Sequence, residues 1–182
     1  MTRKRLLTSA VVAAALATGV GAPAVTNDDD DDRHDGKRLK ADLSGFNETL
    51  VPLSTTGRGS FRGRLSRGET EIEWRLDYRR LEGTVTQAHI HFGDHHQSGG
   101  ISVFLCSNLG NGPAGTPACP AAPAEVTGTS AAVDVIGPAN QGITAGQFAE
   151  LVRAIKRGVT YVNVHSTLYP GGEIRGQIKV DD

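Results

Sequence analysis

Three histidines are the residues of this sequence whose type and spacing best suit metal chemistry. His89 and His91 lie two residues apart in segment 85–92, where apolar and polar residues alternate as in a β-strand. Residues two apart on a strand project from the same face, roughly 6.5–7 Å apart, so the two imidazoles could converge on one cation. His165 lies in a second alternating segment, 159–166, again on the parity opposite to the apolar residues. The pattern predicts that the three rings meet outside the hydrophobic interior, within a few ångströms of one point.

The chemistry that such a cluster would support is the binding of a transition metal. Ligation by nitrogen alone suits copper or zinc, and the order of affinities favours Cu(II). We therefore expect copper, with zinc as the alternative ion. His95 or His96, in the polar segment 93–100, could supply a fourth ligand. Arg175 could attract an anion beside the metal, which would make it the catalytic residue of any redox reaction.

The polar neighbours of the histidines allow two interpretations. Glu173, Asn163 and Gln177 could orient the second ring nitrogen of a metal ligand. They could equally hydrogen-bond to the histidines in a structural network that holds no metal, in which Arg175 would bridge Glu173. The sequence contains no serine–histidine–acid arrangement, glycine-rich phosphate loop or HExxH motif. Whether the protein is an enzyme therefore stays open at this point.

The first 24 residues have the pattern of a secretory signal peptide. Arg3-Lys4-Arg5 precedes an apolar segment, 6–20, and Ala22-Pro23-Ala24 fits a cleavage site. The apolar segment is shorter than the ~20 residues of a membrane span, so we expect cleavage after residue 24 and no stable membrane insertion. Residues 25–37 include five consecutive aspartates and predict a solvated, disordered acidic linker. We expect a secreted, periplasmic or cell-envelope protein.

The charge and the two cysteines limit the partners and the compartment. The formal net charge of −1 gives no electrostatic footprint for nucleic acid, and we expect no nucleic-acid partner. A segment rich in glycine, proline and alanine separates Cys106 from Cys119. In an oxidising compartment we expect a disulfide between them, although a thiolate metal site is the alternative. On the chain-entropy model, closing such a loop stabilises the fold by about 3 kcal/mol.

Residues 38–182 are predicted to form one all-β domain. Many glycines between short alternating segments favour this class. The expected strands cover approximately residues 39–46, 58–65, 72–78, 85–92, 101–106, 126–136, 159–166 and 173–180.

One helix is expected between the strands predicted at 126–136 and 159–166. Thr144 is a good N-cap, and Gln147 has the spacing of a capping box. An apolar stripe follows, and Gly158 ends the helix; the stripe consists of Phe148, Leu151, Val152 and Ile155. About eight strands with one crossover helix predict an antiparallel Greek-key β-sandwich or flattened barrel.

Three motifs give the sequence a specific resemblance. They are Leu43-Ser44-Gly45-Phe46-Asn47-Glu48 with Pro52 and Thr56-Gly57-Arg58-Gly59, the histidine segment 85–93, and segment 158–166 followed by Pro170-Gly171-Gly172-Glu173-Ile174-Arg175-Gly176-Gln177-Ile178. In this order they resemble the CHRD family, a domain first described in chordin and also found in bacterial secreted proteins. The resemblance covers roughly residues 38–180. It implies a β-rich extracellular domain and no defined biochemical activity.

A weaker similarity is to copper-zinc superoxide dismutase. That family also has an H-x-H pair on one strand, a later histidine at the end of a strand and an arginine near the C-terminus, which His89 and His91, His165 and Arg175 match in order and kind. The similarity implies a Greek-key barrel and superoxide chemistry at copper. Two functions are thus carried forward: a secreted CHRD-type metal-binding protein, and a non-catalytic extracellular module with a protein partner, in which the histidines are structural. The sequence does not indicate the oligomeric state.

Overall fold

The computed structural model describes residues 36–181. The predicted signal peptide, 1–24, and nearly all of the acidic linker, 25–37, lie outside the described residues. The described strands and helix, in chain order, are β1 (Lys37–Ser44), β2 (Arg58–Leu65), β3 (Glu71–Arg79), β4 (Val85–Phe92), β5 (Gly100–Ser107), β6 (Ala124–Ala131), α1 (Phe148–Lys156), β7 (Thr160–Ser166), β8 (Ile174–Gln177) and β9 (Lys179–Asp181).

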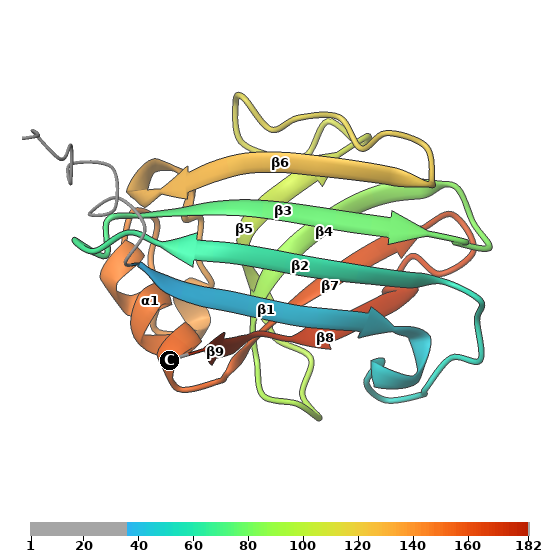
Figure 1. The fold of residues 1–182 in the computed structure, drawn as a ribbon, viewed down its shortest axis with the longest axis horizontal. Coiled ribbons are helices and arrows are strands. Elements are labelled where there is room, and N and C mark those ends of the chain that lie inside the picture. Colours follow the sequence, from blue (N-terminus) through green and yellow to red (C-terminus); the bar gives the residue numbers. More distant parts are fainter. Residues whose placement is uncertain (1–35, 182) are drawn as a thin grey trace, which may run out of the picture.

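The strands form one antiparallel sheet that curls into a nearly closed barrel (Figure 1). The strand order is β5-β4-β7-β8-β1-β2-β3-β6, and β9 also pairs with β1. The two outer strands, β5 and β6, meet at a seam. The segment after β6 also contacts β5 there, because the backbone N–H of Ile136 donates to the carbonyl oxygen of Ser102 at 2.9 Å. The predicted all-β antiparallel fold with one helix is confirmed.

Alternating apolar residues fill the interior of the barrel. On β3, Ile72, Trp74, Leu76 and Tyr78 are buried, as the alternation of this segment predicted. The helix α1 lies against the end of the barrel where β1 begins (Figure 1). Its predicted apolar stripe is buried against the core. No helix within residues 36–181 has the length and hydropathy needed to cross a membrane.

The helix begins later than the capping pattern predicted. Thr144 and Gln147 do interact, because the Thr144 N–H donates to Oε1 of Gln147 at 2.8 Å. Between them, however, Gly146 has a φ of 83°, which is outside the helical region. The segment 144–147 is therefore a turn, and α1 starts at Phe148.

Two predicted strands also differ in extent. The strand expected at 126–136 ends at Ala131, where the backbone N–H donates to Oδ2 of Asp134 and a short 3-10 turn replaces the ladder. The last strand, expected as one piece at 173–180, is divided into β8 and β9 at Ile178. The Ile178 N–H donates to the carbonyl oxygen of Thr160, so this residue leaves the alignment of its neighbours.

The predicted disulfide is present and closes the loop after β5. Cys106 and Cys119 are bonded, and both are buried. Asn108 ties the same loop, since its Nδ2 donates to the Cys119 carbonyl oxygen and its Oδ1 accepts from the Cys119 N–H, each at 2.9 Å. A disulfide of this kind is typical of proteins from oxidising compartments.

Candidate metal centre

Neighbouring strands bring the three histidines to one face of the sheet. In the β4–β7 ladder, Gln87 lies opposite His165, His89 opposite Asn163, and His91 opposite Tyr161. These pairs alternate with the apolar pairs of the ladder, which point into the barrel. The histidines therefore occupy the outer face, as the parity of their segments predicted.

The pairing of β4 with β5 is irregular beside two of these histidines. Its register shifts between Ala88 and His89 and again between Ile90 and His91. Such bulges bend a strand and re-aim its side chains, and they occur often at functional sites. They place Phe104 of β5 directly opposite His89. The sequence alternation of β5 does not reveal this placement.

The three imidazoles converge closely. Nδ1 of His89 and Nε2 of His165 are 3.2 Å apart. The ring centroid of His89 is 5.3 Å from that of His91 and 5.0 Å from that of His165. One ring nitrogen from each residue lies within 4.8 Å of the other two, so the cluster could hold a metal ion. We call His89, His91 and His165 the histidine cluster.

The histidine cluster is buried although it lies on the outer face. The exposed fractions of His89, His91 and His165 are 0%, 8% and 6%. Two loops contact the rings: Nδ1 of His91 is 2.9 Å from the carbonyl oxygen of Gly99, and Nδ1 of His165 is 3.0 Å from that of Pro170. These two loops thus hold the rings of His91 and His165 in place.

The backbone contacts fix the protonation of the rings. A carbonyl oxygen only accepts, so Nδ1 of His91 and of His165 carries the proton, and each Nε2 presents a lone pair. His89 then donates from Nδ1 to Nε2 of His165. Nε2 of His89 and Nε2 of His91 are buried without a hydrogen-bond partner among residues 36–181. Metal-binding histidines typically donate their other N–H to a carbonyl in this way.

Burial keeps the histidines neutral. Desolvation lowers the pKa of His89 to about 2, and the nearby His165 and His91 add to the effect. Desolvation also lowers the pKa of His91 to about 4, against the opposing hydrogen bond to Gly99. The pKa of His165 is lowered for the same reason. Neutral imidazole is the form that binds metals, so neutral pH requires no proton release before binding.

Two further histidines that the sequence offered as a fourth ligand lie outside the cluster. His95 and His96 are exposed on the loop after β4, with their ring centroids 4.8 Å apart. The described residues bring no fourth His, Cys, Asp or Glu ligand atom into the cluster.

The polar residues predicted to orient the ligands make other contacts. Glu173 is buried and accepts from the backbone N–H groups of Glu82 and Gly83. Gln177 donates to backbone carbonyl oxygens of the loops that flank β4 and β7. Asn163 donates to Oε1 of Glu48 at 2.7 Å. The carbonyl oxygens of Gly99 and Pro170 make the contacts to the rings instead.

Arg175 lies beside the histidine cluster but contacts a loop. It is 2% exposed, and its two terminal nitrogens donate to the Asp94 carbonyl oxygen at 2.8 Å and to Oγ1 of Thr49 at 3.1 Å. Its Cζ lies 3.4 Å from the ring centroid of Tyr161. Tyr161 in turn stacks on His91, with centroids 4.8 Å apart and planes within 2°. Three planar groups thus lie in one stack.

Sequence reasoning missed Tyr161 as part of the site. Its hydroxyl oxygen accepts from the Gly99 N–H at 3.1 Å, and the Gly99 carbonyl oxygen contacts His91. Tyr161 therefore positions the backbone group that orients a candidate ligand. The sequence alternation does indicate that Tyr161 lies on the same face as Asn163 and His165, because the three residues have the same strand parity.

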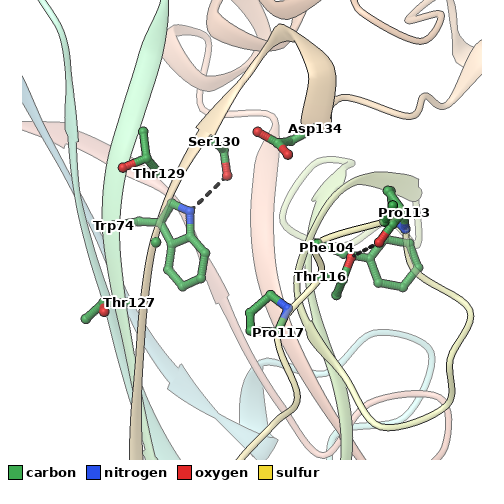
Figure 2. Close-up of a pocket in the computed structure, with 12 residues that line it drawn as sticks. Trp74, Phe104, Pro113, Thr116, Pro117, Thr127, Thr129, Ser130 and Asp134 are labelled. Atoms are coloured by element: carbon green, nitrogen blue, oxygen red, sulfur yellow. Dashed lines mark hydrogen bonds between the residues drawn. The ribbon is translucent and has the colours of Figure 1, made fainter.

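A cavity lies next to the histidine cluster, at the seam of the barrel. It has a volume of about 280 Å³ and is lined by Trp74, Phe104, Pro117, Ser130 and Asp134, among others (Figure 2). Nε1 of Trp74 donates to Oγ of Ser130 at 2.8 Å within its wall. The Phe104 ring packs edge-on against His89, with centroids 4.4 Å apart. Phe104 is thus shared by the cavity and the histidine cluster.

Comparison with known proteins identifies one family. The CHRD domain family matches residues 39–178 of the chain. No curated protein and no solved structure matches the chain. The comparisons give no evidence for the weaker similarity to copper-zinc superoxide dismutase.

Proposed function

The chain belongs to the CHRD domain family, and we propose that it is a metal-binding member that holds one transition-metal ion on His89, His91 and His165. Copper is the preferred ion of this proposal and zinc the alternative, because imidazole suits both and copper binds more tightly. The observation that carries the proposal is that one nitrogen of each ring lies within 4.8 Å of the other two, while Nε2 of His91 is buried with no hydrogen-bond partner among the described residues.

A purely structural histidine network explains these atoms less well. Leaving a buried acceptor unsatisfied costs about 1–3 kcal/mol. In the structural interpretation Asn163, Glu173 and Gln177 would have satisfied the rings, but their hydrogen bonds go to other groups. A cation between the three rings would use the lone pairs of His91 Nε2 and His165 Nε2, and that of His89 Nδ1 once the His89 proton moves to Nε2. The metal interpretation therefore accounts for more of the geometry.

The chemistry of a bound copper ion would be ligand binding or one-electron transfer. The carbonyl oxygens of Gly99 and Pro170 would hold His91 and His165 in the tautomer that presents Nε2 to the ion. Superoxide dismutation is not included in this proposal, because the guanidinium of Arg175 is buried and donates to the Asp94 carbonyl oxygen and to Thr49. An anion guide would need N–H groups that are free to meet an incoming anion.

Metal titration tests the proposal. Purified protein would be titrated with Cu(II), with Cu(I) under reducing conditions and with Zn(II), alongside the triple variant His89→Ala, His91→Ala, His165→Ala. We expect one equivalent of metal to bind to the parent protein and none to the triple variant. The matched control is the double variant His95→Ala, His96→Ala, which removes two exposed histidines and should bind as the parent does. Equal uptake by the parent and the triple variant would exclude the proposal.

A second candidate function is a non-catalytic extracellular module with a protein partner. One observation favours it: the loop between β1 and β2 exposes three large apolar side chains, Phe46, Leu50 and Val51, at 60%, 94% and 65%. Exposed apolar groups that lie together often mark interaction sites. If this function holds, Leu50→Asp would abolish capture of an extracellular partner, whereas removing the histidine cluster would not affect capture.

The proposed location is outside the cytoplasm. The disulfide Cys106–Cys119 supports an oxidising compartment. The sequence pattern of residues 1–24 supports export with cleavage after Ala24. N-terminal sequencing of the protein recovered from the culture medium or periplasm would test the cleavage site.

A further inference from the structure

We infer that the histidine cluster is selective for monovalent copper, Cu(I), over Cu(II) and other divalent ions. This inference rests on the proposed metal-binding function and adds the charge of the ion that the site accepts. Two features of the structure carry it: a ligand set with no negative charge, and a buried cation beside it.

The first feature is the neutrality of the ligands. The cluster consists of three histidines, and no carboxylate or thiolate ligand atom of the described residues joins it. The rings are neutral and their exposed fractions do not exceed 8%. The cost of burying an uncompensated ion grows with the square of its charge. A dication in this cluster would therefore be penalised far more than a monocation.

The second feature is the buried guanidinium of Arg175. It stacks on Tyr161, which stacks on His91, so one aromatic ring separates its positive charge from the cluster. Its hydrogen bonds go to carbonyl and hydroxyl oxygens, and no carboxylate lies within ion-pair distance among residues 36–181.

Two acids interact with this charge, Glu48, which is half-buried, and Asp94, which is exposed and therefore screened by solvent. Glu48 interacts electrostatically with Arg175 and accepts a hydrogen bond from Asn163. Desolvation raises the pKa of Glu48 to about 7, so close to neutral pH a large share of this carboxyl is uncharged. Glu173, although buried, accepts from the Glu82 and Gly83 N–H groups.

The number of ligands points in the same direction. Zinc in proteins is almost always four-coordinate, with a fourth protein ligand or a water that needs an open position. Three imidazoles that are buried beneath two loops offer neither a fourth protein ligand nor an exposed position. Softer Cu(I) accepts fewer ligands and needs no anionic partner.

The effect of Arg175 can be estimated. At roughly 8–10 Å and an effective dielectric constant of about 20, each unit of metal charge is disfavoured about 20-fold by one fixed positive charge. A dication carries one unit more than Cu(I). Arg175→Met should therefore strengthen Cu(II) and Zn(II) binding by about 20-fold relative to Cu(I) binding.

The test measures three dissociation constants on the full protein. Cu(I) would be buffered with a competing chromophoric chelator in ascorbate under nitrogen, Cu(II) with glycine, and Zn(II) with a zinc indicator. We expect Cu(I) to bind most tightly, and copper bound as Cu(I) to stay silent in electron paramagnetic resonance after exposure to air. Tighter binding of Cu(II) or Zn(II) would overturn the inference but leave the proposed function intact. Failure of all three ions to bind would overturn both.

Variants of Arg175 add an independent comparison. Arg175→Lys keeps the charge and should keep the preference for Cu(I), whereas Arg175→Met should lose about 20-fold of it. Equal shifts in the two variants would mean that loop contacts, rather than charge, set the preference. If Arg175→Met does not fold, the dissociation constants of the unmodified protein still decide the inference.

Discussion

His89 and His165 share one proton across two strands. They lie 76 residues apart in the chain, and Nδ1 of His89 is 3.2 Å from Nε2 of His165. Because Nδ1 of His165 is committed to the Pro170 carbonyl oxygen, His89 must be the donor in this pair. A metal ion that binds both residues would take the place of this proton, which would move to Nε2 of His89. Metal and proton therefore compete for the same position between the two rings.

Metal should stabilise the fold through the cluster. An ion at a hundredfold excess over its dissociation constant adds about 2.7 kcal/mol to the free energy of unfolding if it binds only the native state. We expect this gain in the parent protein and its loss in His165→Ala, measured by urea denaturation with and without metal.

His95→Ala is the matched control for that experiment. His95 is exposed and contributes only backbone atoms to its contact with Arg175, so its side chain should not matter for metal. A gain that survives in His165→Ala but disappears in His95→Ala would place the ion on the loop instead of in the cluster.

The metal-free protein should lose stability as pH falls below about 6.5. The unfolded histidines titrate near 6.5, whereas burial lowers the pKa of His91 to about 4 and that of His89 to about 2 in the fold. The unfolded state therefore binds more protons in this range, and stability falls with pH by up to about 1.4 kcal/mol per pH unit for each histidine. The stability gained by keeping these histidines neutral is fully present only at a pH above the pKa of the unfolded histidines.

The pH effect is best measured by comparison with a variant. Glu48 acts in the opposite sense, since burial raises its pKa to about 7 and its protonated form favours the fold at lower pH. His91→Phe keeps an aromatic ring against Tyr161 and removes one titrating group. Urea denaturation between pH 5 and about 6.5 should show a shallower pH slope for His91→Phe than for the parent. Identical slopes would mean that His91 is not held neutral by the fold.

Phe104 should control how fast the metal leaves. Its ring packs edge-on against His89 and lines the seam cavity (Figure 2). Phe104→Ala should open a path from the cavity to the cluster, so transfer of metal to an excess of chelator should become faster in stopped-flow measurements. Thr127→Ala, which changes an exposed residue of the cavity wall, is the control. Unchanged rates for Phe104→Ala would show that the metal exchanges by another route.

The disulfide should stabilise the domain without forming part of the metal site. Replacing Cys106 and Cys119 by alanine should lower the free energy of unfolding by about 3 kcal/mol on the chain-entropy model. Asn108 still ties the loop through its two hydrogen bonds to Cys119, so the loop should stay near β5. We expect unchanged metal stoichiometry by elemental analysis. Loss of the bound metal in the double variant would link the loop to the cluster.

The strand pattern allowed much of the fold to be predicted from the sequence. Alternation on β3 and β4 set which side chains face the interior, and parity placed His89, His91 and His165 on a common face. The apolar stripe of α1 was also predicted from the sequence. These features depend on local periodicity, which a sequence displays directly.

The remaining features depend on contacts between distant segments. The burial of the cluster arises from loops that carry Gly99 and Pro170, and no local pattern shows where a loop folds back. The placement of Phe104 results from bulges in the β4–β5 pairing. Arg175 was expected to attract an anion, but it is buried and hydrogen-bonds to a distant loop. Periodicity shows on which face of a strand a side chain lies, but it does not show which segments cover that face.

The location of a bound ion tests the central claim most directly. Crystals of the copper-loaded protein would be measured on both sides of the copper absorption edge, and an anomalous difference map would be calculated. We predict one strong peak between the rings of His89, His91 and His165, within about 2.0–2.2 Å of one nitrogen of each. A peak at His95 and His96, or none above the background in the cluster, would contradict the account.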